Sequence, residues 1–112
     1  MNREARKYLY DISQAISSIL DDFLDDIHSL DQFETDKKTQ AAVERMLMII
    51  GEAVYKLQQQ GIVFSSGDRI INRRNTLAHQ YDAYNPYTIW ISIQRELPGL
   101  KAEVEQLLNE QD

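Results

Sequence analysis

The chain has 112 residues, enough for one domain, and its 43% hydrophobic and 27% charged residues are typical of a globular protein. It has no cysteine, which excludes disulfides, thiolate catalysis and cysteine-bound metals. The net charge of −6 lies entirely in residues 1–36, which hold three basic and nine acidic side chains. We expect this acidic face to repel RNA. No apolar run reaches the roughly 20 residues of a membrane span, and no signal-peptide core follows Met1, so a cytoplasmic location is expected.

The first predicted helix carries an apolar stripe over about 25–30 residues, with apolar side chains at the three- and four-residue spacings of one helix face. These are Leu9, Ile12, Ile16, Ile19, Phe23, Ile27 and Leu30. Asp25 and His28 have the spacing of carboxylate-bridged metal helices, but a second such motif and inward-facing glutamates are missing, so no metal site is expected. The aspartates around Asp25 are interpreted as a solvated face, with docking of a basic partner as the alternative.

A second apolar stripe, from Val43 to Leu57, predicts another long helix. Thr35 or Asp36 is the expected N-cap, and Gly61 is the expected stop. Gly51 lies inside this helix, where glycine costs about 1 kcal/mol relative to alanine. A helix usually tolerates that cost where another backbone packs close to it.

The rest of the chain also shows helical periodicity. A shorter helix is expected to begin at residues 65–68, and Asn85-Pro86 has the residues of a helix start. Pro98-Gly99 predicts a kink or break before a last helix. No alternating strand pattern of useful length occurs. We therefore predict one all-α domain over residues 1–112, an up-down bundle of four or five helices with the two long ones antiparallel.

Residues 73–87 combine arginine, histidine and three tyrosines. Arginine can hold a phosphate through two hydrogen bonds, and histidine can move a proton near neutral pH. This combination suits RNA transesterification, in which the 2′-hydroxyl of the RNA is the nucleophile and no metal or cofactor is needed. A helix-capping histidine and a surface ion pair are the alternative interpretation.

Helix geometry constrains such a site. Arg74 and His79 are five residues apart, and positions five apart on a straight helix face directions about 140° apart. The two side chains converge only if the helix ends or bends near Ala78, or if a second copy completes the site. Acid–base cleavage uses two proton-transferring groups, and a two-fold dimer would supply two copies of His79. The chemistry therefore favours a homodimer.

The spacing Arg74-x4-His79-x-Tyr81 resembles the signature of HepT-like toxins, a branch of the HEPN all-α ribonucleases. The segment from Glu44-Arg45 to Gly51-Glu52-Ala53 is similar to the "ERxLxIIGEA" helix of that family. Residues 74–79 match its "RNxLxH" helix, and Trp90 and the Leu97-Pro98-Gly99-Leu100 corner resemble its C-terminal helices. The resemblance covers roughly residues 8–108.

This resemblance implies a ribonuclease toxin of a toxin–antitoxin pair. Arg74 and His79 would be catalytic at a dimer interface, and an MntA-type nucleotidyltransferase antitoxin would neutralise the toxin by transferring AMP to Tyr81. Arg73, Asn75 and Tyr84 are the expected supporting or RNA-binding residues. RNA, the antitoxin and a second copy are the expected partners, with a larger hetero-oligomer with the antitoxin as the alternative assembly.

Three further points stay open at this stage. Tyr84 and Tyr87 lie close enough to Tyr81 to be alternative acceptors of AMP. The chain could also be a non-catalytic subunit that binds a nucleotide or a nucleotidyltransferase partner, with Arg74 and His79 holding the ligand or the interface. A purely structural helical dimer is the third possibility.

Overall fold

The computed structural model describes residues 1–79 and 85–110. Its elements are α1 (Arg3–Ser17), a π-helical turn η1 (Ser18–Phe23), α2 (Leu30–Thr35), α3 (Lys37–Gln59), α4 (Gly67–His79) and α5 (Pro86–Glu110). All regular structure in the described residues is helical, so the predicted all-α class is confirmed. None of these helices combines the length and apolar character needed to cross a membrane.

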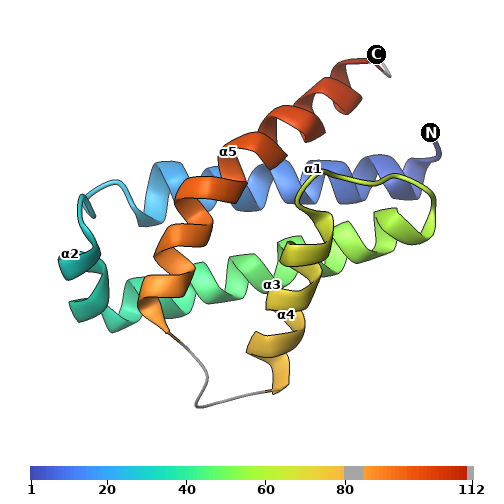
Figure 1. Cartoon of the computed structure of the whole chain (residues 1–112). Coiled ribbons are helices and arrows are strands. Elements are labelled where there is room, and N and C mark those ends of the chain that lie inside the picture. Colours follow the sequence, from blue (N-terminus) through green and yellow to red (C-terminus); the bar gives the residue numbers. More distant parts are fainter. Residues whose placement is uncertain (80–84, 111–112) are drawn as a thin grey trace.

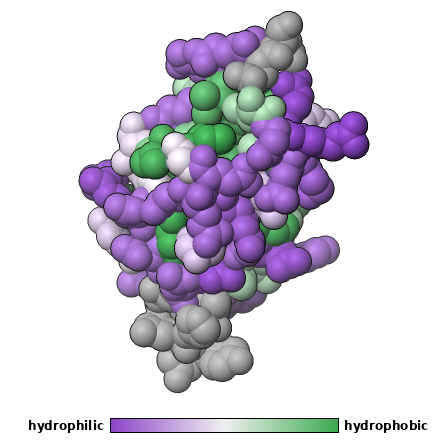
Figure 2. All heavy atoms as spheres, turned by 90° about the vertical axis from the view of Figure 1, so that its right-hand side faces the viewer, coloured by the Kyte–Doolittle hydropathy of each residue, from purple (hydrophilic) through white to green (hydrophobic). Residues whose placement is uncertain are grey.

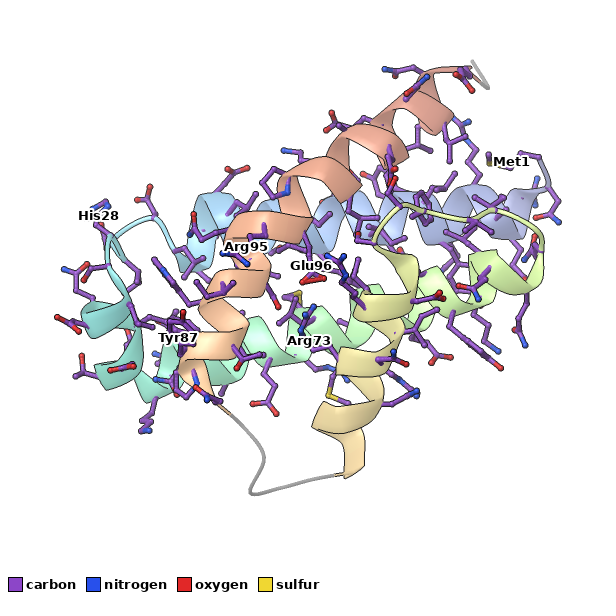
Figure 3. The ribbon with its side chains drawn as sticks, viewed as in Figure 1. Met1, His28, Arg73, Tyr87, Arg95 and Glu96 are labelled. Carbon is purple, nitrogen blue, oxygen red and sulfur yellow. The ribbon has the colours of Figure 1, made fainter. Side chains whose placement is uncertain are left out.

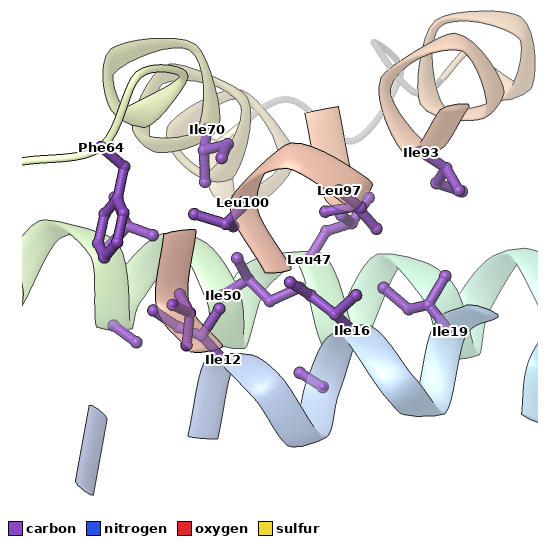
Figure 4. Packing of buried hydrophobic residues seen from close by; sticks show 14 of the residues in the cluster. Ile12, Ile16, Ile19, Leu47, Ile50, Phe64, Ile70, Ile93, Leu97 and Leu100 are labelled. Atoms are coloured by element: carbon purple, nitrogen blue, oxygen red, sulfur yellow. The ribbon is translucent and has the colours of Figure 1, made fainter. Parts of the chain in front are cut away.

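The long helices α1 and α3 lie side by side and run in opposite directions, as predicted (Figure 1). The side-chain amide of Asn2 donates to Gln60 Oε1 at 3.1 Å and ties the beginning of α1 to the end of α3. α5 crosses over α1 and α2, and α4 crosses α3 (Figure 1). The core lies where α1, α3 and α5 meet, and Ile12, Ile50 and Leu97 are each at most 2% exposed there (Figure 4).

The predicted boundaries of α3 and α5 are confirmed by their caps. Asp36 is the N-cap of α3, and its Oδ1 accepts from the Thr39 amide at 3.0 Å, which lowers the pKa of this carboxyl below its ordinary value of 3.8. α3 ends beside Gly61, which has a φ of +86°, a conformation that favours glycine. Asn85 caps α5 by accepting from the Tyr87 amide at 2.9 Å.

The first helix is shorter than its apolar stripe predicts. α1 ends at Ser17, η1 follows, and the regular helix does not continue through Ile27 to Leu30. Four aspartates lie at this end, where their charges repel one another and oppose the negative end of the helix dipole: Asp21, Asp22, Asp25 and Asp26. Phe33 of the short α2 instead fills the core, with its ring centroid 5.4 Å from that of Trp90.

Of the kink or break expected at Pro98-Gly99, the break is absent, because α5 is one helix from Pro86 to Glu110 with Pro98 inside it. Pro98 and Gly99 are exposed, while Leu97 and Leu100 on either side are buried. Burial of these leucines on one face offsets the backbone hydrogen bond that proline cannot make. The helix changes direction near its middle (Figure 1).

Candidate functional site

The structure defines the arginine side of the predicted site. Arg73, Arg74 and Asn75 lie in α4, which stays helical as far as His79. The side chain of His79 lies outside the described part of the chain, and so do Tyr81 and Tyr84, which belong to residues 80–84. α4 is helical from Arg74 through Ala78 and ends at His79, so whether the two side chains converge within one copy stays a prediction.

Gly51 of α3 determines how closely α4 approaches. A Cβ added at Gly51 would overlap the Cβ of Arg74 and lie 2.8 Å from its Cγ. It would also lie 3.4 Å from the carbonyl oxygen of Ile70. The stem of Arg74 thus crosses α3 at Gly51, the residue that weakens this helix locally. The close approach of another backbone at Gly51, expected from the sequence, is confirmed.

The guanidinium of Arg74 is held at the surface by two oxygen atoms. Its Nη2 lies 2.9 Å from Glu52 Oε2, and its Nη1 donates to Asn75 Oδ1 at 2.9 Å. The side chains of Arg74 and Glu52 are 34% and 43% exposed, so solvent screens this pair and a phosphate can reach the guanidinium. Asn75, expected as a supporting residue, contacts the predicted catalytic arginine directly.

Glu52 is a site residue that the sequence reasoning did not assign. It follows Gly51 directly, and that position is the available signal, since a long side chain one residue after the crossing point can reach the other helix. Its carboxylate lies 2.9 Å from Arg74 Nη2 and would compete with any anion for that nitrogen.

Arg74 lies on the rim of two hollows. One, of about 290 Å³, is lined from α1 by Tyr8 and Asp11 and from α3 by five residues: Arg45, Met48, Ile49, Glu52 and Ala53. The other, of about 360 Å³, is lined by Glu52, Tyr55, Ile71 and Asn75. An anion held by Arg74 would therefore have room on either side of it.

Arg73 lies in a different environment from its neighbour. Its Nη1 and Nη2 donate to the two carboxylate oxygens of Glu96 at 3.0 and 2.8 Å, which links α4 to α5 (Figure 3). The two side chains are only 19% and 8% exposed. Arg73 thus has a structural role that the sequence analysis did not assign, and its expected contact with RNA stays a prediction.

The described acidic groups form no metal-binding cluster. No three histidine, aspartate or glutamate side chains among the residues that the structure describes are grouped as ligands.

Glu44, two turns before Gly51 on α3, is partly buried, and loss of hydration raises the pKa of its carboxyl above the ordinary value of 4.5.

The described residues are all helical in their regular structure, and the Arg-x4-His motif lies on α4, as the resemblance to HEPN-like ribonucleases predicts. A family model described as "Ribonuclease HepT-like" matches residues 12–107. The protein "Putative RNase MJ0127" of Methanocaldococcus jannaschii is 34% identical, over 96% of this chain and 90% of its own length. "Probable ribonuclease HepT" of Thermococcus cleftensis is also 34% identical, over 96% of this chain and 98% of its own length. No solved structure matches significantly.

The chain therefore belongs to the HepT-like ribonuclease family, as the resemblance of its motifs predicted. This membership makes it an endoribonuclease of the HEPN type and makes RNA its substrate class.

Proposed function

We propose that the chain is a toxin that cleaves RNA without a metal ion, with Arg74 and His79 as its catalytic residues. The observation that carries this mechanism is the position of Arg74, whose stem crosses Gly51 and whose partly exposed guanidinium lies beside two hollows. A guanidinium held there would stabilise the extra negative charge on a phosphorus atom under attack.

In the proposed reaction, the 2′-oxygen of one nucleotide attacks the adjacent phosphorus as a base removes the 2′-hydroxyl proton. The bond from phosphorus to the 5′-oxygen breaks, and an acid protonates that oxygen. The products are a 2′,3′-cyclic phosphate and a free 5′-hydroxyl. His79 is assigned to proton transfer because histidine titrates near neutral pH.

A site shared by two copies agrees best with the course of α4. Since α4 is helical through His79, positions 74 and 79 face about 140° apart within one copy. A two-fold axis near the end of α4 would bring His79 of one copy towards Arg74 of the other and supply two proton-transferring groups.

Cleavage of a defined RNA in EDTA tests the chemistry. Cutting should persist without metal, yield a cyclic phosphate end, and stop when hydrogen replaces the 2′-hydroxyl at the scissile nucleotide. Cutting of the deoxy-substituted RNA would refute the mechanism. A protein that binds nucleotides but never cuts RNA would instead support the non-catalytic subunit.

Mixing two inactive variants tests the shared site. Arg74→Ala and His79→Ala proteins, each inactive alone, should recover part of the activity when they exchange subunits, because some mixed dimers contain one complete site. An active monomer at micromolar concentration in sedimentation would contradict this arrangement.

We assign regulation to Tyr81, with a nucleotidyltransferase antitoxin of the MntA type as the partner. AMP on this tyrosine would add a phosphate and a base near Arg74 and exclude RNA. After incubation with antitoxin and ATP, wild-type protein should gain AMP in intact-mass spectrometry, and Tyr81→Phe should gain none. An equal gain in the variant would move the acceptor to Tyr84 or to Tyr87, which is 54% exposed at the start of α5.

A further inference from the structure

The acidic first third of the chain contains a basic groove. All three cationic residues of positions 1–36 lie in the first two turns of α1: Arg3, Arg6 and Lys7. Together with Tyr10 they follow the i, i+3, i+4, i+7 spacing of one helix face. With Leu108 of α5 they line a groove of about 440 Å³ that has no acidic residue in its lining.

Figure 2 faces this end of the molecule and shows an apolar strip bordered by hydrophilic side chains. Asp21 lies 15 positions beyond Arg6, roughly 20 Å along a helix. The four aspartates therefore lie well along the chain from these cations, and the expected repulsion of RNA by the acidic segment stays a prediction.

The groove stands on a rigid base. Asn2 caps α1 by accepting from the Ala5 amide at 2.7 Å, and the side chains of Ala5 and Leu9, on the opposite face, are at most 1% exposed. Lys7 pairs with Asp11 at 2.9 Å, but its side chain is 70% exposed, so water or a phosphate can replace that partner. The three cations therefore lie on a helix whose opposite face is buried, and all three residues are exposed.

The chemistry of the groove suits single-stranded RNA. Tyr10 is 57% exposed and offers a ring on which a base can stack, and the cations next to it can contact successive phosphates. A duplex keeps its bases stacked inside and could not use the tyrosine. An acidic peptide could use the cations, but it would have no base to place on the ring.

α1 also connects this groove to Arg74. Tyr8 and Asp11 line the hollow that Arg74 also lines. In the sequence, Tyr8 follows Lys7 of the groove and Asp11 follows Tyr10 of the groove. The two openings are therefore neighbours on α1, since Lys7 of the groove pairs with Asp11 of the hollow at 2.9 Å. One RNA strand could occupy both by crossing this pair.

We propose that Arg3, Arg6, Lys7 and Tyr10 form an accessory binding surface for the single-stranded RNA that is cut at Arg74. The assignment of RNA rests on the proposed ribonuclease function. The surface would supply affinity away from the reacting phosphate, so its loss should raise KM with little change in kcat.

The test measures RNA binding separately from cleavage. Fluorescein-labelled oligouridine is titrated by anisotropy at several salt concentrations, in a His79→Ala background that cannot cut. Arg3→Gln/Arg6→Gln should lower the slope of log affinity against log salt by about 1.4, since each phosphate contact contributes about 0.7 for single strands. Tyr10→Ser should weaken binding about tenfold through lost stacking.

Lys37→Gln/Lys38→Gln is the matched control, because it removes the same charge from exposed positions at the start of α3. All variants should keep the wild-type melting temperature. Suppose that the wild-type protein cuts RNA, while the groove variant and the control bind RNA with equal affinity and an equal salt slope. This result would overturn the accessory surface and would still support the ribonuclease function.

Two further outcomes separate the alternatives. If the groove variant and the control bind RNA alike and only the groove variant loses affinity for polyglutamate, the surface binds an acidic polypeptide and the RNA assignment is overturned. Wild-type protein that binds RNA through the groove but never cuts it would support the surface and refute the ribonuclease.

Discussion

Arg73 and Arg74 are adjacent in sequence and lie on the same helix, yet they have opposite environments. Arg73 faces α5, where Glu96 takes both ends of its guanidinium in a nearly buried ion pair. Arg74 crosses Gly51 of α3 and holds Glu52 at the surface, beside two hollows. A side chain in the first environment should contribute mainly to stability, and one in the second should contribute mainly to function.

Removing Arg73 should give the largest loss of stability. Arg73→Ala leaves Glu96 without its partner at a position only 8% exposed, and breaking a buried ion pair from one side costs about 3–5 kcal/mol. Urea denaturation should show this loss in the free energy of unfolding. The double variant Arg73→Met/Glu96→Leu should recover most of it, because no charge is then left buried. A loss below about 1 kcal/mol in Arg73→Ala would place this pair with ordinary surface pairs.

Removing Arg74 should reverse that pattern. Arg74→Ala should lower kcat for RNA cleavage about 10²- to 10³-fold, as expected for a lost donor to transition-state charge. The same change should cost at most about 1 kcal/mol of stability, because its partner Glu52 is 43% exposed. Arg74→Lys keeps the charge without the planar fork, and intermediate activity would separate the two contributions. Full activity in Arg74→Ala would contradict the assignment.

A methyl group at Gly51 tests whether helix crossing positions Arg74. Gly51→Ala should cost about 1–3 kcal/mol through overpacking against the Arg74 stem, and it should lower cleavage as the guanidinium moves. Gly99→Ala is the matched control, since an added Cβ there meets no atom within 4 Å. That variant should gain about 0.5–1 kcal/mol of stability. Equal stability in the two variants would show that the crossing at Gly51 has room to relax.

The smallest effect is expected at Glu52. Glu52→Gln removes the carboxylate that competes with phosphate for Arg74, so binding of uncleavable deoxy-substituted RNA should tighten about two- to fivefold, in line with an exposed pair. Stability should hardly change. Glu105→Gln is the control, because it removes the same charge from a surface pair with Lys101. Weaker binding in Glu52→Gln would show instead that the carboxylate orients Arg74 for substrate.

Local patterns in the sequence predicted much of the fold, because helix caps and stripes act over a few residues. The Asp36 and Asn85 caps and the stop at Gly61 follow from such short-range rules. The same rules left a kink or a break open at Pro98, and the core on both sides of the residue keeps α5 continuous.

The sequence alone determined the helical class, the antiparallel long pair and the family to which the Arg74 motif belongs. Only the tertiary structure decided which arginine faces solvent, because that depends on the acids that two other helices bring to α4. Glu52 and Glu96 each lie 22 positions from Arg74, one before it and one after it. No local pattern in the sequence pairs either glutamate with a particular arginine. The basic groove of α1 has the same origin, since Leu108 reaches it only through the packing of α5 on α1.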